Sequence, residues 1–254
     1  MVVTPELLSA FPILKPLPLS VLARLANHSE LKKFSRRGIV LQAREAEDCV
    51  CFLFEGRLQG VDFTIDGREV GLYFVEPGNF CGELALFDQE PQSEFVIALT
   101  AAVVVFVPAN ELREVMLTTP GVMNVLGSKL ASRVRQMTFQ RSLLSLPNIG
   151  QRVCCQLWLL ISHKARTRVT NESDPYSGQK DSSKMQENSE NTVEITNPPT
   201  HMEIAIMLNV SRETVTRIFQ TLQNRQIVRR DGSAKLIVRK PERLQQLAQG
   251  SDEL

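Results

Sequence analysis

A pair of helices joined by a tight turn is predicted by residues 200–230, THMEIAIMLNVSRETVTRIFQTLQNRQIVRR. Thr200 can cap the first helix, and Glu203 three residues later completes the capping-box pattern. Asn209 suits the turn, because its side chain tolerates left-handed backbone angles. Ser211 is a second N-cap, from which the second helix begins. The stretch therefore has the sequence pattern of a complete helix-turn-helix.

The second helix, which we expect to end near Asn224, is amphipathic. Its apolar positions follow the spacing of one buried helical face, and they are Val215, Ile218, Phe219 and Leu222. Its polar positions lie near the N-terminus, which is the part of a recognition helix that reads base edges in the major groove. The residues that we predict to contact DNA are Ser211, Arg212, Glu213, Thr216 and Arg217.

A β-hairpin and an excess of positive charge accompany the two helices. Short strands are predicted at residues 227–230 and 235–239, on either side of Asp231-Gly232, a strong hairpin signal. Residues 200–243 contain nine Lys and Arg against four Asp and Glu, an excess of five positive charges, although the whole chain carries +1. We therefore predict a winged helix-turn-helix that binds double-stranded DNA. A winged module that binds protein instead is the alternative.

The segment SRETVTR, Ser211–Arg217, resembles the recognition helix of the CRP/FNR superfamily of bacterial transcription regulators. The resemblance covers nearly the whole chain and is strongest to the cyclic-AMP receptor protein branch, which reads a TGTGA-type half-site. It implies that Arg212 and Arg217 each contact a guanine and that Glu213 accepts a hydrogen bond from a cytosine. The side-chain chemistry agrees, because an Arg fork fits guanine O6 and N7 and a carboxylate accepts from cytosine N4.

Most of the preceding chain is predicted to be rich in β-strands. Short helices are expected at residues 5–10 and 18–27, and six short apolar or alternating runs, separated by turn signals, follow between residues 39 and 107. This pattern is typical of a sandwich or barrel. The resemblance identifies residues 1–118 as the family's jelly-roll cyclic-nucleotide-binding domain. The implied fold class is α+β, with a jelly roll, a long dimerisation helix and a C-terminal winged helix-turn-helix.

Residues 80–100, FCGELALFDQEPQSEFVIALT, resemble the family's phosphate-binding cassette. The matching residues are Gly82, Glu83, Leu84 and Ser93. Gln92 replaces the family's Arg, and Glu94 follows where a small residue is usual. Losing one partner of a buried charge pair costs about 2–5 kcal/mol, which is a roughly 30- to several-thousand-fold loss of affinity. We therefore expect a degenerate effector pocket that does not bind cyclic AMP well.

Three explanations of the altered pocket remain open. The domain could be ligand-free and constitutively competent, it could bind another nucleotide or metabolite, or it could act in a heterodimer with a ligand-binding paralogue. A redox signal is a further alternative because of the cysteines near the pocket, which are Cys49, Cys51 and Cys81. Buried cysteines, however, commonly behave as small hydrophobic residues.

A long helix is predicted at residues 120–146 by an apolar stripe. The stripe consists of Val122, Val125, Leu126, Leu130, Val134, Met137 and Leu144. The charged and polar side chains that face elsewhere include Arg133, Arg135, Gln136 and Gln140. The stripe could pack on its own domain, but the family uses this helix for a two-fold contact, and a palindromic site calls for a symmetric protein. We therefore predict a homodimer.

The predicted division of the chain has three parts. Residues 1–118 form the jelly roll, residues 119–147 the dimerisation helix and hinge, and residues 148–254 the DNA-binding domain. The hinge is marked by Pro147-Asn148. A polar insertion at about residues 165–198 is expected to be flexible, and it could contact RNA polymerase or another regulator.

Other classes of protein are disfavoured by what the sequence lacks. It contains no Walker loop, dinucleotide-binding glycine run, nucleophile elbow or metalloprotease pair, so we predict no enzyme, catalytic residue or cofactor. The three histidines show no metal-ligand spacing, so no metal site is expected. No apolar run approaches the roughly 20 residues of a membrane helix. Five cysteines without a disulfide-type pattern suit a reducing cytoplasm.

Overall fold

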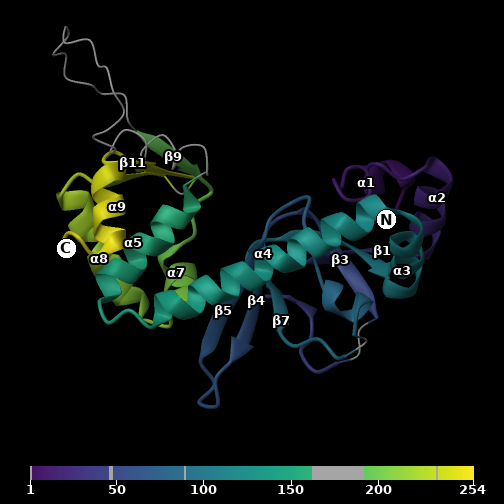
Figure 1. Cartoon of the computed structure of the whole chain (residues 1–254), viewed down its shortest axis with the longest axis horizontal. Helices are drawn as coiled ribbons and strands as arrows, with labels where there is room; N and C mark the ends of the chain where they lie inside the picture. The colour runs from purple at the N-terminus through teal and green to yellow at the C-terminus, as the bar shows by residue number, and fades with distance from the viewer. Residues whose placement is uncertain (1, 46–47, 89, 162–191, 233) are drawn as a thin grey trace, which may run out of the picture. The chain divides into compact units, whose positions relative to one another are not determined.

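The computed structural model describes residues 2–45, 48–88, 90–161, 192–232 and 234–254. The chain separates into two compact units, Met1–Thr138 and Phe139–Leu254, which are considered one at a time. Unit 1 contains the β-rich part and most of the long helix, and unit 2 contains the helix-turn-helix (Figure 1).

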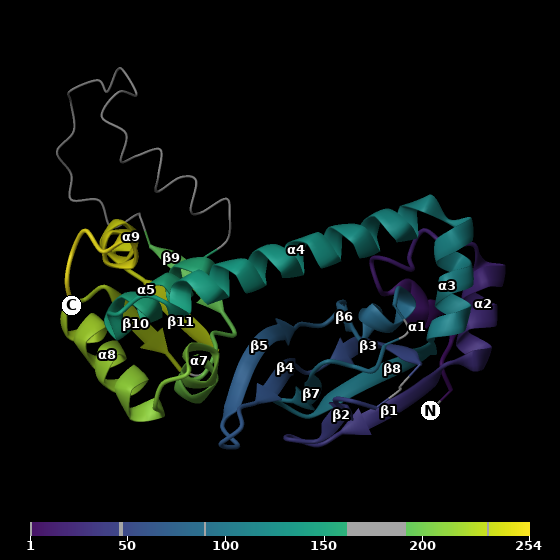
Figure 2. The same cartoon turned by 60° about the horizontal axis from the view of Figure 1, so that its bottom comes forward.

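Unit 1 is built on two antiparallel four-stranded sheets (Figure 2). The first has the order β1-β8-β3-β6, with bounds Glu30–Phe34, Ala102–Pro108, Cys49–Glu55 and Phe80–Cys81. The second has the order β2-β7-β4-β5, with bounds Ile39–Leu41, Phe95–Ala98, Leu58–Phe63 and Glu69–Val75. Side chains of both sheets share one apolar core, so the sheets face each other as a sandwich. The predicted β-rich domain is confirmed.

Strand β3 is buried on both of its faces, because a second core lies outside the sandwich. Val50 and Phe52 belong to this outer core, whereas Cys51 and Leu53 belong to the core between the sheets. Successive side chains of a strand point to opposite faces, so burial of both faces demands an unbroken apolar run. The sequence CVCFLF has this property.

Short helices cover the outer core of unit 1. They are α1, α2 and α3, with bounds Pro5–Ser9, Leu19–His28 and Ala109–Thr118. Their buried side chains include Leu8, Leu25 and Leu112. Helices near the N-terminus were predicted, but α3 and the strand β1 were not. Both are short segments whose apolar positions are mixed with charged ones, so their periodicity is weak.

The long helix α4 extends over Pro120–Leu144, close to the predicted 120–146. Its apolar stripe divides into two sets. Val122 and Leu126 are buried in the core of unit 1, whereas Val125, Val134 and Met137 remain exposed. The stripe thus both attaches the helix to its own domain and presents an apolar surface.

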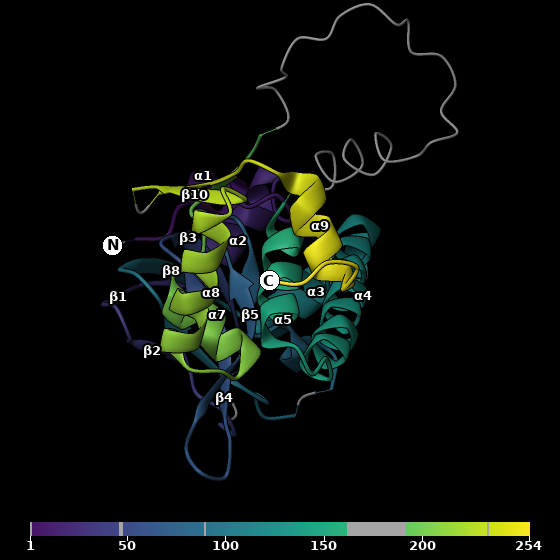
Figure 3. The ribbon, with the colours of Figure 1, turned by 90° about the vertical axis from the view of Figure 1, so that its left-hand side faces the viewer.

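The part of unit 2 that the structure describes combines helices with a three-stranded antiparallel sheet of order β10-β11-β9. The helices α5, α7, α8 and α9 have bounds Ile149–Leu160, His201–Leu208, Arg212–Asn224 and Pro241–Gln249. The strands β9, β10 and β11 have bounds Val193–Thr196, Val228–Asp231 and Lys235–Val238. Helices α7 and α8 pack against each other (Figure 3). The predicted winged helix-turn-helix is confirmed, and α9 is an addition to it.

The local signals of the helix-turn-helix have the expected geometry. Thr200 and Glu203 form a complete capping box at the start of α7. Asn209 ends that helix with φ 51°, in the left-handed region. The Ser211 hydroxyl caps α8. Ile218, predicted to be buried, is only partly so.

Part of the predicted insertion, residues 165–191, lies outside the described residues. Residues 193–196, near the end of the predicted insertion, form the strand β9. Among the described residues, no helix is both long enough and apolar enough to cross a membrane.

Candidate DNA interface and effector pocket

The N-terminal half of α8 presents its charged side chains to solvent. Arg212, Glu213 and Arg217 are all exposed. The Ser211 hydroxyl accepts a hydrogen bond from the Thr214 backbone N–H at 3.2 Å, which fixes the start of the helix. Hydrogen bonds from the backbone N–H of Glu213 and from the Ser211 hydroxyl lower the pKa of the Glu213 carboxyl, so this side chain is a hydrogen-bond acceptor at neutral pH. Two fork-shaped donors and one acceptor therefore face outward together.

Thr216 differs from the other four predicted DNA contacts, because it is partly buried. Its hydroxyl donates to the Arg212 backbone carbonyl at 2.9 Å and lies 3.0 Å from Nδ1 of His201. The His201 ring packs against Phe219, with ring centroids 4.4 Å apart. His201 was not predicted to matter, yet it links α7 to the recognition turn of α8.

Burial lowers the pKa of His201, and the positive charges of Arg230 and Arg212 lower it further. Its Nε2 atom is buried and has no hydrogen-bond partner among the described residues. The environment thus favours the neutral imidazole. Because Thr216 already donates to a carbonyl, the His201 Nδ1 atom is best assigned as the donor to the Thr216 oxygen.

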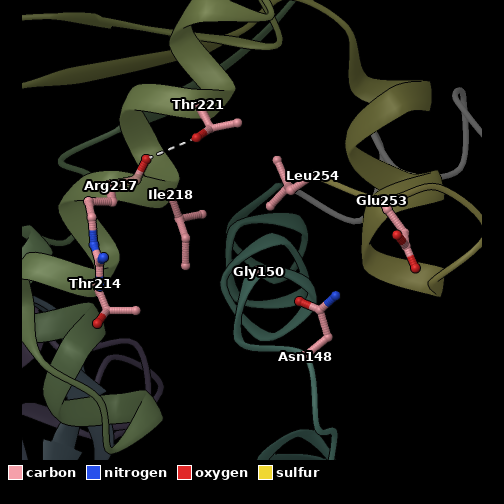
Figure 4. Close-up of a pocket in the computed structure, with 8 residues that line it drawn as sticks. All are labelled: Asn148, Gly150, Thr214, Arg217, Ile218, Thr221, Glu253 and Leu254. Atoms are coloured by element: carbon pink, nitrogen blue, oxygen red, sulfur yellow. Dashed lines mark hydrogen bonds between the residues drawn. The ribbon is translucent and has the colours of Figure 1, made fainter.

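A hollow of about 340 Å³ lies beside α8 in unit 2 (Figure 4). It is lined by Asn148, Gly150, Thr214, Arg217, Ile218, Thr221, Glu253 and Leu254. Asn148 caps α5, with its side-chain oxygen accepting from the Gln151 N–H at 3.1 Å. The hollow therefore combines the N-terminus of one helix, which favours anions, with a cation and hydroxyl groups from another, although Glu253 adds an acidic group to the lining.

The predicted effector-pocket residues come together in unit 1 at the short 3₁₀-helix η1, Glu83–Leu86. Gly82 precedes it with φ 80°, a left-handed conformation that favours glycine. Gln92 is 3% exposed, and its side-chain amide donates to the Gly82 carbonyl at 3.4 Å. The Ser93 hydroxyl donates to the Glu94 carboxylate. Gln92 and Ser93 thus bond to neighbouring protein groups.

Glu83 is fully buried, and its counter-charge comes from the long helix α4. Arg133 Nη1 lies 2.8 Å from Glu83 Oε1. Burial raises the pKa of Glu83, although the Arg133 charge opposes this rise. Burial works against the Arg133 charge, but Tyr73 and Glu83 raise the pKa of the guanidinium, so this side chain stays cationic.

Sequence reasoning did not find Arg133 as a site residue. A buried Glu83 would have indicated that some cation pairs with it, because buried carboxylates are almost always paired. It could not have indicated which of the 29 Lys and Arg residues does so. The partner lies 50 residues away along the chain, and only the packing of α4 selects it.

The cysteines near the pocket lie on two neighbouring strands of the same sheet. Cys51 and Cys81 occupy opposite positions of β3 and β6, and both are free and buried. Burial raises the pKa of the Cys51 thiol well above its usual value. A buried protonated thiol is a poor nucleophile. No group of three or more potential metal ligands occurs in the part of the chain that the structure describes.

The fold and the site define a class of protein, a DNA-binding transcription regulator with a sensor-type domain. Residues 31–119 match the cyclic nucleotide-binding domain, and residues 151–247 match the Crp-like helix-turn-helix domain. This chain belongs to the CRP/FNR superfamily of transcription regulators. Members of this family are regulators and not enzymes, as the sequence predicted.

Known relatives extend over most of the chain. The CRP-like cAMP-activated global transcriptional regulator of Mycobacterium tuberculosis is 25% identical over 232 residues, covering 91% of this chain and 94% of that protein. The cAMP-activated regulator CRP of Pasteurella multocida is 22% identical over 212 residues, covering 83% of this chain and 91% of that protein. The structure of FixK2 from Bradyrhizobium japonicum has the same fold, with a TM-score of 0.65 at 17% identity. The match covers 86% of this chain and 96% of that one.

The environment of His201 predicts a pH-dependent stability of unit 2. The unfolded chain binds a proton near pH 6.5, whereas the folded domain resists it. Proton binding therefore stabilises the unfolded state relative to the folded state as pH falls through about 6.5. We expect the free energy of unfolding to decrease between about pH 7.5 and 5.5. Urea titration followed by fluorescence of Trp158, the one tryptophan of the chain, reports it.

The matched comparison is His201→Gln against His28→Gln, which changes a histidine of unit 1. The His201→Gln protein should lose most of the pH dependence of the Trp158 transition, and His28→Gln should keep it. An unchanged pH dependence in His201→Gln would contradict the assignment.

Proposed function

We propose that this protein is a dimeric, sequence-specific transcription regulator that reads a TGTGA-like palindrome and does not require cyclic AMP. The observation that carries the proposal is the exposed set at the start of α8, which is Ser211, Arg212, Glu213, Thr216 and Arg217 with Thr216 partly covered. The winged domain holds these side chains in place. Independence from cyclic AMP is inferred from the two changes in the phosphate cassette, Gln92 and Glu94.

Base reading follows from the spacing of the two exposed arginines. Arg212 and Arg217 are five residues apart, so they are separated by about 7.5 Å along the helix. Base pairs are stacked about 3.4 Å apart, so this rise corresponds to about two base-pair steps. Each Arg can bind a guanine through two hydrogen bonds, and Glu213 between them can accept from a cytosine amine.

Phosphate contacts have candidates next to the bases that would be read. The α5 N-terminus, Thr214 and Arg217 line one hollow, and a phosphate there would receive hydrogen bonds from both helices. Exposed cations on the wing and after it add sequence-independent attraction. They are Arg229, Arg239 and Lys240, whereas the exposed Lys235 is paired with Glu194 at 2.9 Å.

A dimer is supported by the exposed part of α4. Met123, Gly127, Leu130, Val134 and Met137 are spaced alternately by four and three residues, which is the repeat of a coiled-coil seam. Met123, Val134 and Met137 are 37%, 63% and 59% exposed. Large apolar groups in this register are suited to a second copy of the same helix, and a two-fold axis matches a palindrome. A heterodimer with a paralogue would use the same seam.

Independence from cyclic AMP is supported by what replaces the family's phosphate-binding Arg. Gln92 offers a neutral amide that is bonded to Gly82, and the Glu94 carboxylate lies close by with 6% exposure. A cyclic phosphate would therefore meet the Glu94 carboxylate, with no arginine at position 92 to pair with it. Effectors also differ among similar proteins: the regulator CLP of Xanthomonas campestris, described as c-di-GMP responsive, has a TM-score of 0.59 at 18% identity.

The proposed division of labour follows the predicted ranges. Residues 1–118 form the sensor-type domain, residues 119–147 the dimerisation helix and hinge, and residues 148–254 the DNA-binding domain. RNA polymerase is the proposed protein partner at promoters, in the cytoplasm where bacterial DNA lies. Response to another nucleotide, a metabolite or a redox signal is the alternative to a ligand-free sensor domain.

Binding of the purified protein to a labelled TGTGA-N6-TCACA duplex tests the proposal. We expect tight binding relative to a scrambled duplex, with no change on adding excess cyclic AMP. Arg217→Ala should lose roughly 1–3 kcal/mol of discrimination at one base pair of each half-site. Gln223→Ala, at the exposed far end of α8, is the matched control and should keep it. Binding that appears only with cyclic AMP would overturn the account of the pocket.

Charge placed on the seam should separate the protomers. In Met137→Glu, each of two copies loses roughly 1.5–3 kcal/mol of apolar burial, so the dimer should weaken by at least about a hundredfold. Sedimentation equilibrium measures this change. Gln136→Glu, one position off the seam and also exposed, is the control. Equal dimer affinity in the two variants would place the interface elsewhere.

A further inference from the structure

The interior of the unit 1 sandwich contains a buried network of polar side chains drawn from separate elements. Tyr73 comes from β5, Glu83 from η1 and Arg133 from α4, and Glu94 directly precedes β7. The exposed fractions of the first three are 8%, 0% and 6%, and that of the Arg133 side chain is 12%. Four ionisable groups at this depth are unusual, because each loses its hydration.

The guanidinium of Arg133 is the centre of the network. It lies 2.8 Å from Glu83, donates to the Phe80 carbonyl at 3.4 Å and stacks 4.0 Å above the Tyr73 ring. The Tyr73 hydroxyl in turn donates to Glu94 at 2.6 Å. Arg133 thus makes an ion pair, a main-chain hydrogen bond and a cation–π contact, all with the sandwich.

The backbone is adapted to the Tyr73 ring. Gly60 of β4 lies directly opposite Tyr73 in the sheet. A Cβ atom at Gly60 would lie only 2.5 Å from the ring. The ring therefore packs onto bare backbone, and any other residue at position 60 would displace it. Tyr73, Gly60 and Glu94 together build a socket for the Arg133 guanidinium.

The network has the properties of a site that is already occupied. One guanidinium sits among two carboxylates and a phenol, so the charge needs of Arg133 are met within the protein. Oε2 of Glu83 has no hydrogen-bond partner among the described residues, which makes the Arg133 contact to the other oxygen its main compensation. An added cyclic phosphate would bring further negative charge to a site that already holds the Glu83 and Glu94 side chains.

We propose that Arg133 is a built-in ligand of the sandwich, a positioning residue that holds α4 against unit 1 in the way a bound effector would. Helix α4 then stays in one position without a small molecule, and the protein is constitutively competent. The link from α4 to DNA affinity rests on the proposed function. The hold of the sandwich on α4 does not, and it can be measured separately.

Hydrogen exchange of backbone amides in α4, measured on the full chain without nucleotide, tests this hold. Arg133→Ala should speed exchange in the stretch of α4 around residue 133 by at least about tenfold, equivalent to about 1.4 kcal/mol. Arg135→Ala removes an exposed arginine two positions away on the same helix and should leave exchange unchanged. Equal exchange in both variants would overturn the proposal.

Chemical rescue distinguishes a built-in ligand from a simple structural brace. Millimolar guanidinium can refill the socket left by Arg133→Ala, so it should slow α4 exchange back toward the wild-type rate. Sodium chloride at the same ionic strength should have no such effect. Failure of guanidinium to restore protection in a folded Arg133→Ala protein would overturn the proposal.

A conservative variant covers the case in which Arg133→Ala does not fold. Arg133→Lys keeps the positive charge but lacks the planar fork that pairs with Glu83 while stacking on Tyr73. We expect faster α4 exchange than in the wild type, and wild-type exchange would overturn the proposal. Palindrome affinity is measured in parallel. If the wild-type protein binds no palindrome, the proposed function is refuted. The hydrogen-exchange results test the role of Arg133 independently of that outcome.

Discussion

A carboxylate without solvent contact is the constraint on which the organisation of unit 1 depends. Glu83 is 0% exposed, and a buried charge of this kind is tolerated only when a counter-charge is held close to it. The counter-charge is Arg133, delivered by α4 from outside the sandwich. Because one ion pair balances both charges, the position of the long helix and the shape of the pocket are decided together.

The layers of unit 1 make that placement possible. Strands β3 and β8 carry one core between the sheets and a second core beneath the helices, since both of their faces are apolar. Val122 and Leu126 attach the first part of α4 to the outer core. The following turns then place Arg133 at the sandwich interior and leave Val134 and Met137 to solvent. A single helix thus packs against the sandwich with one face and presents apolar side chains to solvent with another.

The DNA-binding unit follows a different logic, in which short-range interactions dominate. The capping box at Thr200, the left-handed Asn209 and the Ser211 cap all act within a few residues of the backbone that they fix. Local caps of this kind fix the position of the helix that carries the exposed arginines, and few polar groups have to be buried to achieve this. Neutral His201 adds one tertiary connection, from α7 to the Thr216 hydroxyl.

The sequence by itself determined the helix-turn-helix, the hairpin of the wing and the departure of Gln92 from the phosphate cassette, because these depend on residue type and near neighbours. It also indicated most strands of the sandwich through their apolar alternation. Tertiary structure alone decided the partner of Glu83, the place of Tyr73 over Gly60 and the split of the α4 stripe into buried and exposed sets. Those outcomes join residues far apart in the chain, and burial, which creates the need for a partner, exists only after the chain has folded.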